Sequence, residues 1–503
     1  MDKKLKIGYH TDEKTGAKNN ICFYGPAKEG AGVDFILCHI DPHKDKTPAE
    51  NCDLVKENAR KIKELGATYI ANFEYQNFIY DCSFKDGIDF ANQPDGTHRI
   101  EINQEYFDAL NGENNLDGLM YDELEHCIIN RNFSILMESK FKTDAPVFKT
   151  DADSFDEQEA LLDRQLCDYA KRGKALGAKA LSGEHVFPVM FHIFARNGII
   201  PNFKSQKESV SNIQFAIAAG AALQYDMPLW NCVDLWYRMT YPGHSADEMY
   251  HNLVFAYLCG VNRVYVESSS RFYDGENITE YGEKFNRFTS EYRNKERDYD
   301  ISDFTPEIGI VRCDDTFWGQ GVLPIPWKGM LFGNPKIKIH KASREYIKVL
   351  NLITHGSTGN GGICADRIEL RSLKKHRSFV PMNNAAVFDD RVRKDKLKTL
   401  KLCFLCGEKI SAETLEDVSV LVKEGLIAVT TKKYAPSNIK VKGAYSEVAD
   451  GKGKWIIVND FGNKKLKKAL ASYLGSKDEM VYKFGDKVIR MKITNNGEGF
   501  YTV

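Results

Sequence analysis

The sequence lacks the features of exported, membrane-spanning and nucleic-acid-binding proteins. No apolar run approaches the roughly 20 residues that cross a membrane. The first residues, MDKKLKIGYHTDEK, contain no apolar segment typical of a signal peptide. Lys and Arg total 69 against 70 for Asp and Glu, so the net charge is only −1, whereas a nucleic-acid partner would require a strong basic patch. We therefore expect a cytoplasmic protein with neither membrane nor nucleic acid as a partner.

Motifs for cofactors and metals are also missing. No G-x-G-x-x-G follows a predicted strand, and no His pair at helical spacing or D-x-D run accompanies the acids. The 12 cysteines are scattered, and the one C-x-x-C, from Cys403 to Cys406, has no second pair at zinc spacing. We expect buried free thiols, no cofactor and no metal. Aromatic residues reach 12%, which suits either sugar-stacking surfaces or a large core.

Strand-like and helix-like runs alternate over the first 300 residues. Such alternation predicts a parallel sheet, and eight units over this length predict a (β/α)8 TIM barrel spanning 1–300 as the catalytic domain. A doubly wound sheet is the alternative. We find no convincing helix between the first two strands. The expected strands are 6–11, 33–41, 67–78, 118–123, 179–186, 199–204, 227–237 and 261–267.

The remaining 200 residues predict two smaller parts. Strands and helices alternate again after Pro306, which favours a flavodoxin-like α/β domain over 305–440. The tail, 441–503, combines one helix with several strands of alternating polarity, and we expect a small α+β region there.

The stretch GLMYDELEH, residues 118–126, is the strongest candidate for chemistry. An apolar run ending at Tyr121 leads directly to Asp122 and Glu123. A carboxylate at the end of a buried strand is out of place in a core, and catalytic groups of α/β barrels lie at the carboxyl ends of strands. The alternative is that Asp122 caps the next helix and Glu123 lies in its first turn.

Other predicted strands also end in polar residues, which would converge on one barrel mouth. Carboxylates for acid/base and nucleophile roles, with flat aromatic rings beside them, are typical of a carbohydrate site. Asp234 shares a strand face with Trp230 and Trp236. Each acid could instead form a structural salt bridge, as Glu267 could with a nearby arginine. The further candidates are His10, His39, Asn72, Tyr121, Glu184 and His185, and the sixth strand ends in Asn202 and Lys204.

The order of barrel, flavodoxin-like domain and small β region resembles the family 42 β-galactosidases and their relatives in clan A of the glycoside hydrolases. The segment WYRMTYPGHSADEMYHNLVFAYLCGVNRVYVES, 236–268, resembles the part of those enzymes that joins the seventh and eighth strands. The resemblance implies a second domain like a glutamine amidotransferase, which often supports trimers, so we expect a homo-oligomer (dimer or trimer). Asp122-Glu123 stands where the family has an Asn-Glu pair after strand four.

The resemblance implies catalytic roles as well. Glu123 carries over as general acid/base. Asp234 holds the place of the nucleophile after strand seven, whereas Glu267 holds it if 6–11 is not a barrel strand, and Glu184 then falls at strand four. We expect a divergent, exo-acting glycoside hydrolase with Glu123 and Glu267 as the working pair. Two other hypotheses remain: a barrel that binds oligosaccharide without cleaving it, and a metal-dependent hydrolase using His10, His39 and an acid.

Overall fold

The protein is described by a computed structural model. The described residues are 3–11, 32–39, 47–73, 88–92, 98–102, 104–122, 148–185, 190–205, 210–235, 244–267, 269–275, 277–314, 330–358 and 377–503. Among them, no helix combines the length and the apolar character that crossing a membrane requires.

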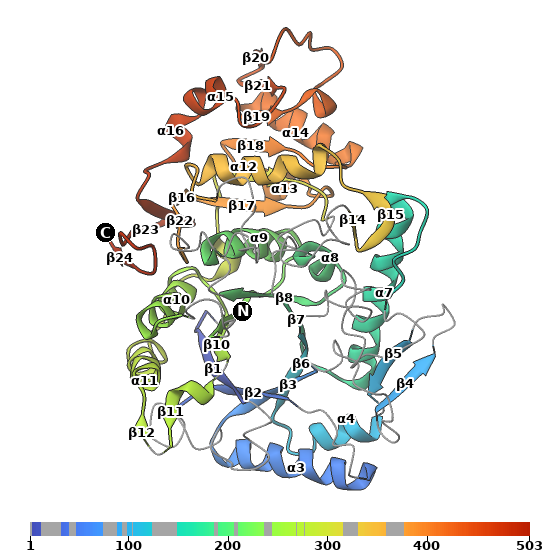
Figure 1. Ribbon diagram of the computed structural model, residues 1–503, viewed down its shortest axis with the longest axis vertical. Helices are drawn as coiled ribbons and strands as arrows, with labels where there is room; N and C mark the ends of the chain where they lie inside the picture. The colour runs from blue at the N-terminus through green and yellow to red at the C-terminus, as the bar shows by residue number, and fades with distance from the viewer. Residues whose placement is uncertain are drawn as a thin grey trace.

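The first part of the chain forms a closed barrel of parallel strands, viewed along its axis in Figure 1. Going round the barrel, the order is β1-β10-β9-β8-β7-β6-β3-β2. This confirms the predicted TIM barrel, including 6–11 as a barrel strand. The strands are β1 (Lys6–Thr11), β2 (Phe35–His39), β3 (Thr68–Asn72), β6 (Leu116–Asp122), β7 (Leu181–His185), β8 (Ile200–Ser205), β9 (Trp230–Asp234) and β10 (Arg263–Glu267).

Helices surround the barrel, and local sequence fixes where they begin and end. Helix α7 (Phe155–Leu176) starts with a capping box between Ser154 and Glu157 and ends at Gly177, whose φ of 104° favours glycine. The others are α3 (Pro48–Glu64), α4 (Gln104–Leu110), α8 (Phe191–Arg196), α9 (Ser211–Gln224), α10 (Ala246–Leu258) and α11 (Glu280–Tyr292), with two hairpins formed by β4 (Ile88–Asn92) and β5 (His98–Ile102), and by β11 (Tyr273–Asp274) and β12 (Asn277–Ile278).

The barrel interior changes from apolar to polar along the strands. Because side chains alternate along a strand, every second residue points inward. The inward residues at the amino ends and in the middle of the strands form one apolar cluster. The described inward residues at the carboxyl ends of the strands are polar. The cluster contains Phe35, Leu37, Ile70, Met120, Ile200, Trp230, Cys232 and Tyr265.

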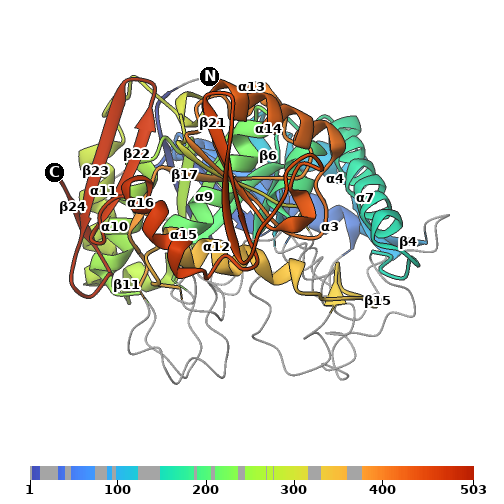
Figure 2. The same ribbon diagram turned by 90° about the horizontal axis from the view of Figure 1, so that it is seen from above.

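A second sheet follows, with the strand order β17-β13-β18-β19-β21-β20. Its first five strands are parallel, and by chain order they run 2-1-3-4-5, as in flavodoxin-like folds. In Figure 2, α12 and α14 lie on opposite sides of this sheet. The elements are β13 (Ile308–Val311), α12 (Glu345–Ile353), β17 (Ala385–Phe388), α13 (Lys394–Leu397), β18 (Leu402–Leu405), α14 (Ala412–Glu424), β19 (Ile427–Thr430), β20 (Tyr445–Asp450) and β21 (Gly453–Val458).

The end of the chain adds a small sheet in the order β16-β22-β23-β24. The remaining elements are β14 (Met330–Leu331), β15 (Asn334–Lys338), β16 (Met382–Asn383), α15 (Lys464–Ala469), α16 (Ala471–Leu474), β22 (Glu479–Phe484), β23 (Lys487–Ile493) and β24 (Phe500–Thr502).

Helix α9 lies between the barrel and the second sheet (Figure 1). It packs against β8 on one side and β17 on the other, and every residue in it except Leu223 is buried. A surface helix would show a polar face, and α9 has none. The contact with β17 is so close that a Cβ added at Gly220 would lie 1.6 Å from the carbonyl oxygen of Val387. Glycine is therefore required at this position.

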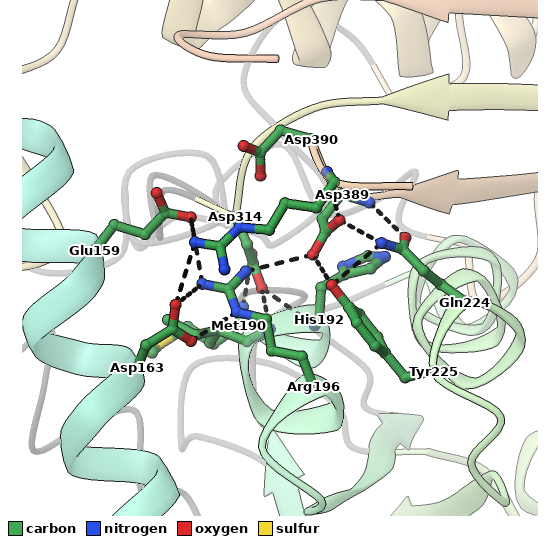
Figure 3. A network of polar contacts seen from close by, with 12 residues as sticks. Glu159, Asp163, Met190, His192, Arg196, Gln224, Tyr225, Asp314, Asp389 and Asp390 are labelled. Atoms are coloured by element: carbon green, nitrogen blue, oxygen red, sulfur yellow. Dashed lines mark hydrogen bonds and ion pairs between the residues drawn. The ribbon is translucent and has the colours of Figure 1, made fainter. Parts of the chain in front are cut away.

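Buried ion pairs join the same two parts beside α9 (Figure 3). The guanidinium of Arg196 donates to Asp163 at 2.6 and 2.7 Å and to Asp389 at 3.3 Å. Asp389, which directly follows β17, also accepts from Gln224 and Tyr225 at the end of α9. Burial alone would raise the pKa of Asp389, but nearby His192 and Arg196 lower it. The junction therefore holds this carboxylate ionised in the protein interior.

We predict that Gly220→Ala strongly destabilises the protein. The added methyl group would collide with β17 backbone atoms, which cannot rotate away as a side chain could, and overpacking of this kind typically costs about 1–3 kcal/mol or more. Urea unfolding measures the change. Gly112→Ala is the matched control, because its added Cβ would meet nothing closer than 3.4 Å. Equal stability of the two variants would contradict the tight contact.

Candidate active site

Lys204 lies at the centre of the polar end of the barrel. It is carried by β8, and its Nζ lies 2.7 Å from Glu184, 2.9 Å from Glu267, 3.5 Å from Asp234 and 3.9 Å from Asp122. We call these four acids the mouth carboxylates; they lie at the carboxyl ends of β7, β10, β9 and β6. The Lys204 side chain is only 2% exposed. A single buried ammonium group thus lies among four carboxylates from four strands.

Glu184 and Glu267 contact the same ammonium, but their pKa values are shifted in opposite directions. Burial, and after it the charge of Asp122, raises the pKa of Glu184 well above its usual range, although Lys204 opposes this. Burial also acts against ionisation of Glu267, but Lys204 and then His10 outweigh it and lower the pKa of Glu267 to about 2. At neutral pH, Glu267 is therefore a carboxylate, whereas Glu184 holds its proton to higher pH than an ordinary glutamate does.

The surrounding polar groups complete the site. His10 Nδ1 lies 3.9 Å from Glu267, and the thiol of Cys232 donates to Glu267 Oε2 at 3.4 Å. Asn72 donates from Nδ2 to Asp122 at 2.9 Å. Its Oδ1, like Oε2 of Glu184, is buried and accepts no hydrogen bond from any described residue. The described part of the site therefore includes two buried oxygens that can accept a hydrogen bond.

Among the described residues, one group of side chains meets the distance requirement for a metal site. Single ligand atoms of Glu184, Cys232 and Glu267 lie within 4.8 Å of one another. The Lys204 ammonium already lies within 3 Å of both carboxylates, so a cation there would have to displace it. Burial, followed by the charges of the two glutamates, raises the pKa of Cys232 well above its usual range, and a neutral thiol is a poor ligand. These residues fit an ammonium group better than a metal ion.

Most of the residues predicted from strand ends lie together here. Asp122, Glu184, Asp234 and Glu267 surround one atom, with His10 and Asn72 beside them. Because β1 is a barrel strand, Glu267 ends the eighth strand and not the seventh, and Asp234 ends the seventh. Glu123 and Trp236 lie outside the described residues, as do the side chains of His39 and His185.

Two predicted contacts point elsewhere, and both need correction. Tyr121 is adjacent to inward-pointing Asp122, so it faces outward and packs edge-on against Tyr169 of α7, with ring centroids 5.4 Å apart. Trp230 does share the inward face with Asp234, but it starts the strand and lies about 13 Å deeper at roughly 3.3 Å per residue. It belongs to the apolar cluster, with the guanidinium of Arg263 4.9 Å from its ring centre.

Sequence reasoning did not select Lys204 and Cys232 as site residues. The sequence pattern marks Lys204 only as a polar residue at the end of the sixth predicted strand. Its position two residues after Asn202 predicts that Lys204 points into the barrel, because side chains alternate along a strand and both residues then face inward. Cys232 lies in the same register between Trp230 and Asp234, but it resembles an ordinary core cysteine.

Comparison with known proteins identifies the fold. No family model matches the chain, and no curated protein matches it. Among solved structures, the β-galactosidase of the haloarchaeon Halorubrum lacusprofundi is similar over 97% of this chain and 93% of its own, with 10% identity and a TM-score of 0.56. The β-galactosidase of Bacillus circulans sp. alkalophilus is similar over 98% and 93%, with 9% identity and a TM-score of 0.57.

A third similar structure is a catalytic mutant of a GH42 β-galactosidase from G. stearothermophilus. It covers 98% of this chain and 93% of its own, with 8% identity and a TM-score of 0.54. These likenesses extend over the barrel and the parts that follow it. They confirm the predicted architecture and its resemblance to the family 42 enzymes. The chain therefore has the fold of these glycoside hydrolases, and at 8–10% identity the likeness shows the fold alone.

We predict that Lys204→Met lowers the free energy of unfolding by about 3–5 kcal/mol at pH 7, because it leaves buried carboxylates without their ammonium. The pKa of Glu267 is lowered in the folded protein, so its ion pair with Lys204 contributes fully to stability at pH values above the ordinary pKa of a glutamate. This contribution is lost as the pH falls from there towards about 2. The deficit of the variant should therefore shrink on acidification. Urea titrations at pH 7 and pH 4 measure this.

Lys401→Met is the control for that experiment. Lys401 pairs with Glu307 at 2.6 Å, but its side chain is 61% exposed. Such pairs are typically worth under about 1 kcal/mol. A similar deficit in both lysine variants, or one that does not vary with pH, would contradict the role assigned to Lys204.

Proposed function

We propose that the protein is a glycoside hydrolase in which Glu184 is the general acid/base and Glu267 the nucleophile. One observation carries this proposal: two glutamates contact the same ammonium, yet their pKa values are shifted in opposite directions. The pKa of Glu184 is raised and that of Glu267 is lowered to about 2. Two carboxyl groups with environments that separate their pKa values match the needs of glycosidic cleavage.

The spacing of the two glutamates favours retention of the anomeric configuration. One oxygen of each lies within 4.8 Å of the other, nearer to the roughly 5–5.5 Å of retaining enzymes than to the 6.5–9.5 Å of inverting ones. Glu267 would attack the anomeric carbon while the bond to the leaving oxygen breaks, and Glu184 would give that oxygen its proton. Water would then hydrolyse the glycosyl ester, with Glu184 accepting the proton.

The family resemblance supports a different pair. With 6–11 as strand one, Asp122-Glu123 follows strand four and Asp234 ends strand seven. Glu123 and Asp234 would then be acid/base and nucleophile. We favour Glu184 and Glu267, because their contacts and opposed pKa shifts are direct properties of the described site.

We predict that Glu184→Gln and Glu267→Gln each lower kcat by roughly 10²–10⁴-fold. Hydrolysis of an aryl-glycoside panel measures it. The Glu184 variant should retain more activity on 4-nitrophenyl glycosides, since a good leaving group needs no proton. Azide should rescue Glu267→Ala by forming a glycosyl azide. Glu123→Gln and Asp234→Asn are the comparison variants, and if they alone abolish turnover, the family-derived pair is correct.

We predict a pH profile of kcat/KM with one main limb on the alkaline side. Glu184 must be protonated to act as an acid, so the rate should fall as the pH rises through its raised pKa. Glu267 is ionised above about pH 2, so it gives no acidic limb above that pH. The alkaline limb should be lost in Glu184→Gln. An unchanged limb in that variant would assign the titration to another group.

A second candidate is a barrel that binds oligosaccharide without cleaving it. The Lys204 ammonium lies within 3 Å of both glutamates, in the space between them that a reacting sugar would need. If this ammonium keeps its place when sugar binds, attack on an anomeric carbon is blocked. Calorimetric binding of a sugar together with no release from any glycoside in the panel would favour this candidate.

A further inference from the structure

Asp390 is a buried carboxyl group at the junction between the barrel and the second sheet (Figure 3). It lies two residues after the end of β17, and its exposed fraction is 0%. Neither of its side-chain oxygens forms a hydrogen bond with a described residue. Its neighbour Asp389 differs, because that carboxylate accepts hydrogen bonds from Arg196, Gln224 and Tyr225. Of these two adjacent buried acids, one is therefore paired, and the other has no hydrogen-bond donor among the described residues.

Charged groups from several elements belong to the network around Asp390, and its described cations are bound to other acids. Arg391 donates to Glu159 at 2.9 Å and to Asp163 at 3.2 Å, and Lys409 donates to Glu159 at 3.0 Å. The start of α14 contributes neutral groups, which bind the backbone carbonyl of Asp390. The titratable and charged groups of the network are Glu159 and Asp163 on α7, His192 and Arg196 on α8, Tyr225 after α9, Asp314 after β13, Asp389 and Arg391 after β17, and Lys409 after β18.

A carboxylate without a partner is costly to bury, and such a group is neutralised by binding a proton. Burial, followed by the charges of Glu159 and Asp389, raises the pKa of Asp390 to about 7, although Arg196 and Arg391 act against this. A metal ion is the other cation that could neutralise the group. The described side chains that meet the distance requirement for a metal lie in the barrel mouth instead. A proton is therefore the occupant that the described residues favour.

We propose that the junction is a proton-dependent switch: the barrel and the second sheet pack tightly while Asp390 carries a proton, and their contact weakens when that proton is lost. Glu159 belongs to the barrel, whereas Asp389 and Asp390 belong to the second sheet. Ionised Asp390 therefore repels a carboxylate on the opposite side of the junction. Such a switch acts on the contact between the two parts and does not depend on the proposed reaction.

Infrared spectroscopy of the full-length protein tests whether Asp390 is protonated. The difference spectrum between the wild type and Asp390→Asn should contain the carbonyl band of a protonated carboxyl group at pH 5. That band should disappear by pH 9, with a midpoint at about pH 7. Absence of the band at pH 5 overturns the proposal, because Asp390 is then ionised in the packed junction.

Urea unfolding tests the effect of that proton on stability. The folded protein holds the proton to higher pH than the unfolded chain does. The stability that this proton contributes therefore falls as the pH rises from the ordinary pKa of an aspartate towards about 7. Asp390→Asn is neutral at every pH, so its folding equilibrium constant should rise at least tenfold relative to the wild type between pH 5 and pH 8. Asp226→Asn, whose side chain is 81% exposed, should show no such change.

Amide hydrogen exchange locates the weakened contact. At pH 8, amides of α9 and β17 should exchange at least fivefold faster in the wild type than in Asp390→Asn. The ratio should be smaller in α3, which lies on the far side of the barrel from the second sheet (Figure 1). Equal exchange in α9 and β17, or a stability difference that does not vary with pH, overturns the switch.

Two further comparisons keep the result unambiguous. The urea titrations are repeated in NaCl, KCl and tetramethylammonium chloride, and a difference between wild type and variant that depends on the cation of the salt assigns the site to a metal ion and overturns the proton. If Asp390→Asn does not fold, Asp390→Ala takes its place in every measurement, because it also removes the carboxyl group and buries no amide.

Discussion

The barrel mouth depends on one ammonium group. Four carboxylates at the ends of four strands would repel each other and resist burial, each at a cost of several kcal/mol, without a cation among them. Lys204 supplies that cation from a strand at the centre of the group. It lies nearest to two glutamates with different surroundings, so the pKa of Glu184 stays raised while that of Glu267 is lowered to about 2. An asymmetric pair of identical side chains is the chemical property from which the proposed activity follows.

The fold could be predicted from the sequence because its determinants are local. Alternating apolar runs, capping residues such as Ser154 and stop glycines such as Gly177 recur around the barrel, and each is visible within about 20 residues. The resemblance to family 42 enzymes rested on the order of these parts. The solved structures share that fold at 8–10% identity, so a similar order of elements forms from largely different residues.

The site could be predicted only in part, because its contacts cross the barrel. Polar residues at strand ends indicate which acids meet, but not which cation lies between them: alternation with Asn202 turns Lys204 inward, yet it does not show that the ammonium contacts acids of four other strands. Tyr121 was misassigned because one residue along a strand reverses the direction of a side chain. Trp230 was misassigned because depth along a strand separates residues that share a face. Both errors concern the direction or the depth of a side chain in the barrel, which the order of residues along the chain does not state.

The position of α9 has a consequence for how this architecture can change in evolution. A helix with buried residues on every side belongs equally to the barrel and to the sheet beyond it. Loss of the second sheet would uncover a long apolar surface on the barrel, which invites aggregation. Neither part is therefore a module that recombination could move alone. Gene rearrangements that preserve the barrel are expected to carry its companion sheet with it.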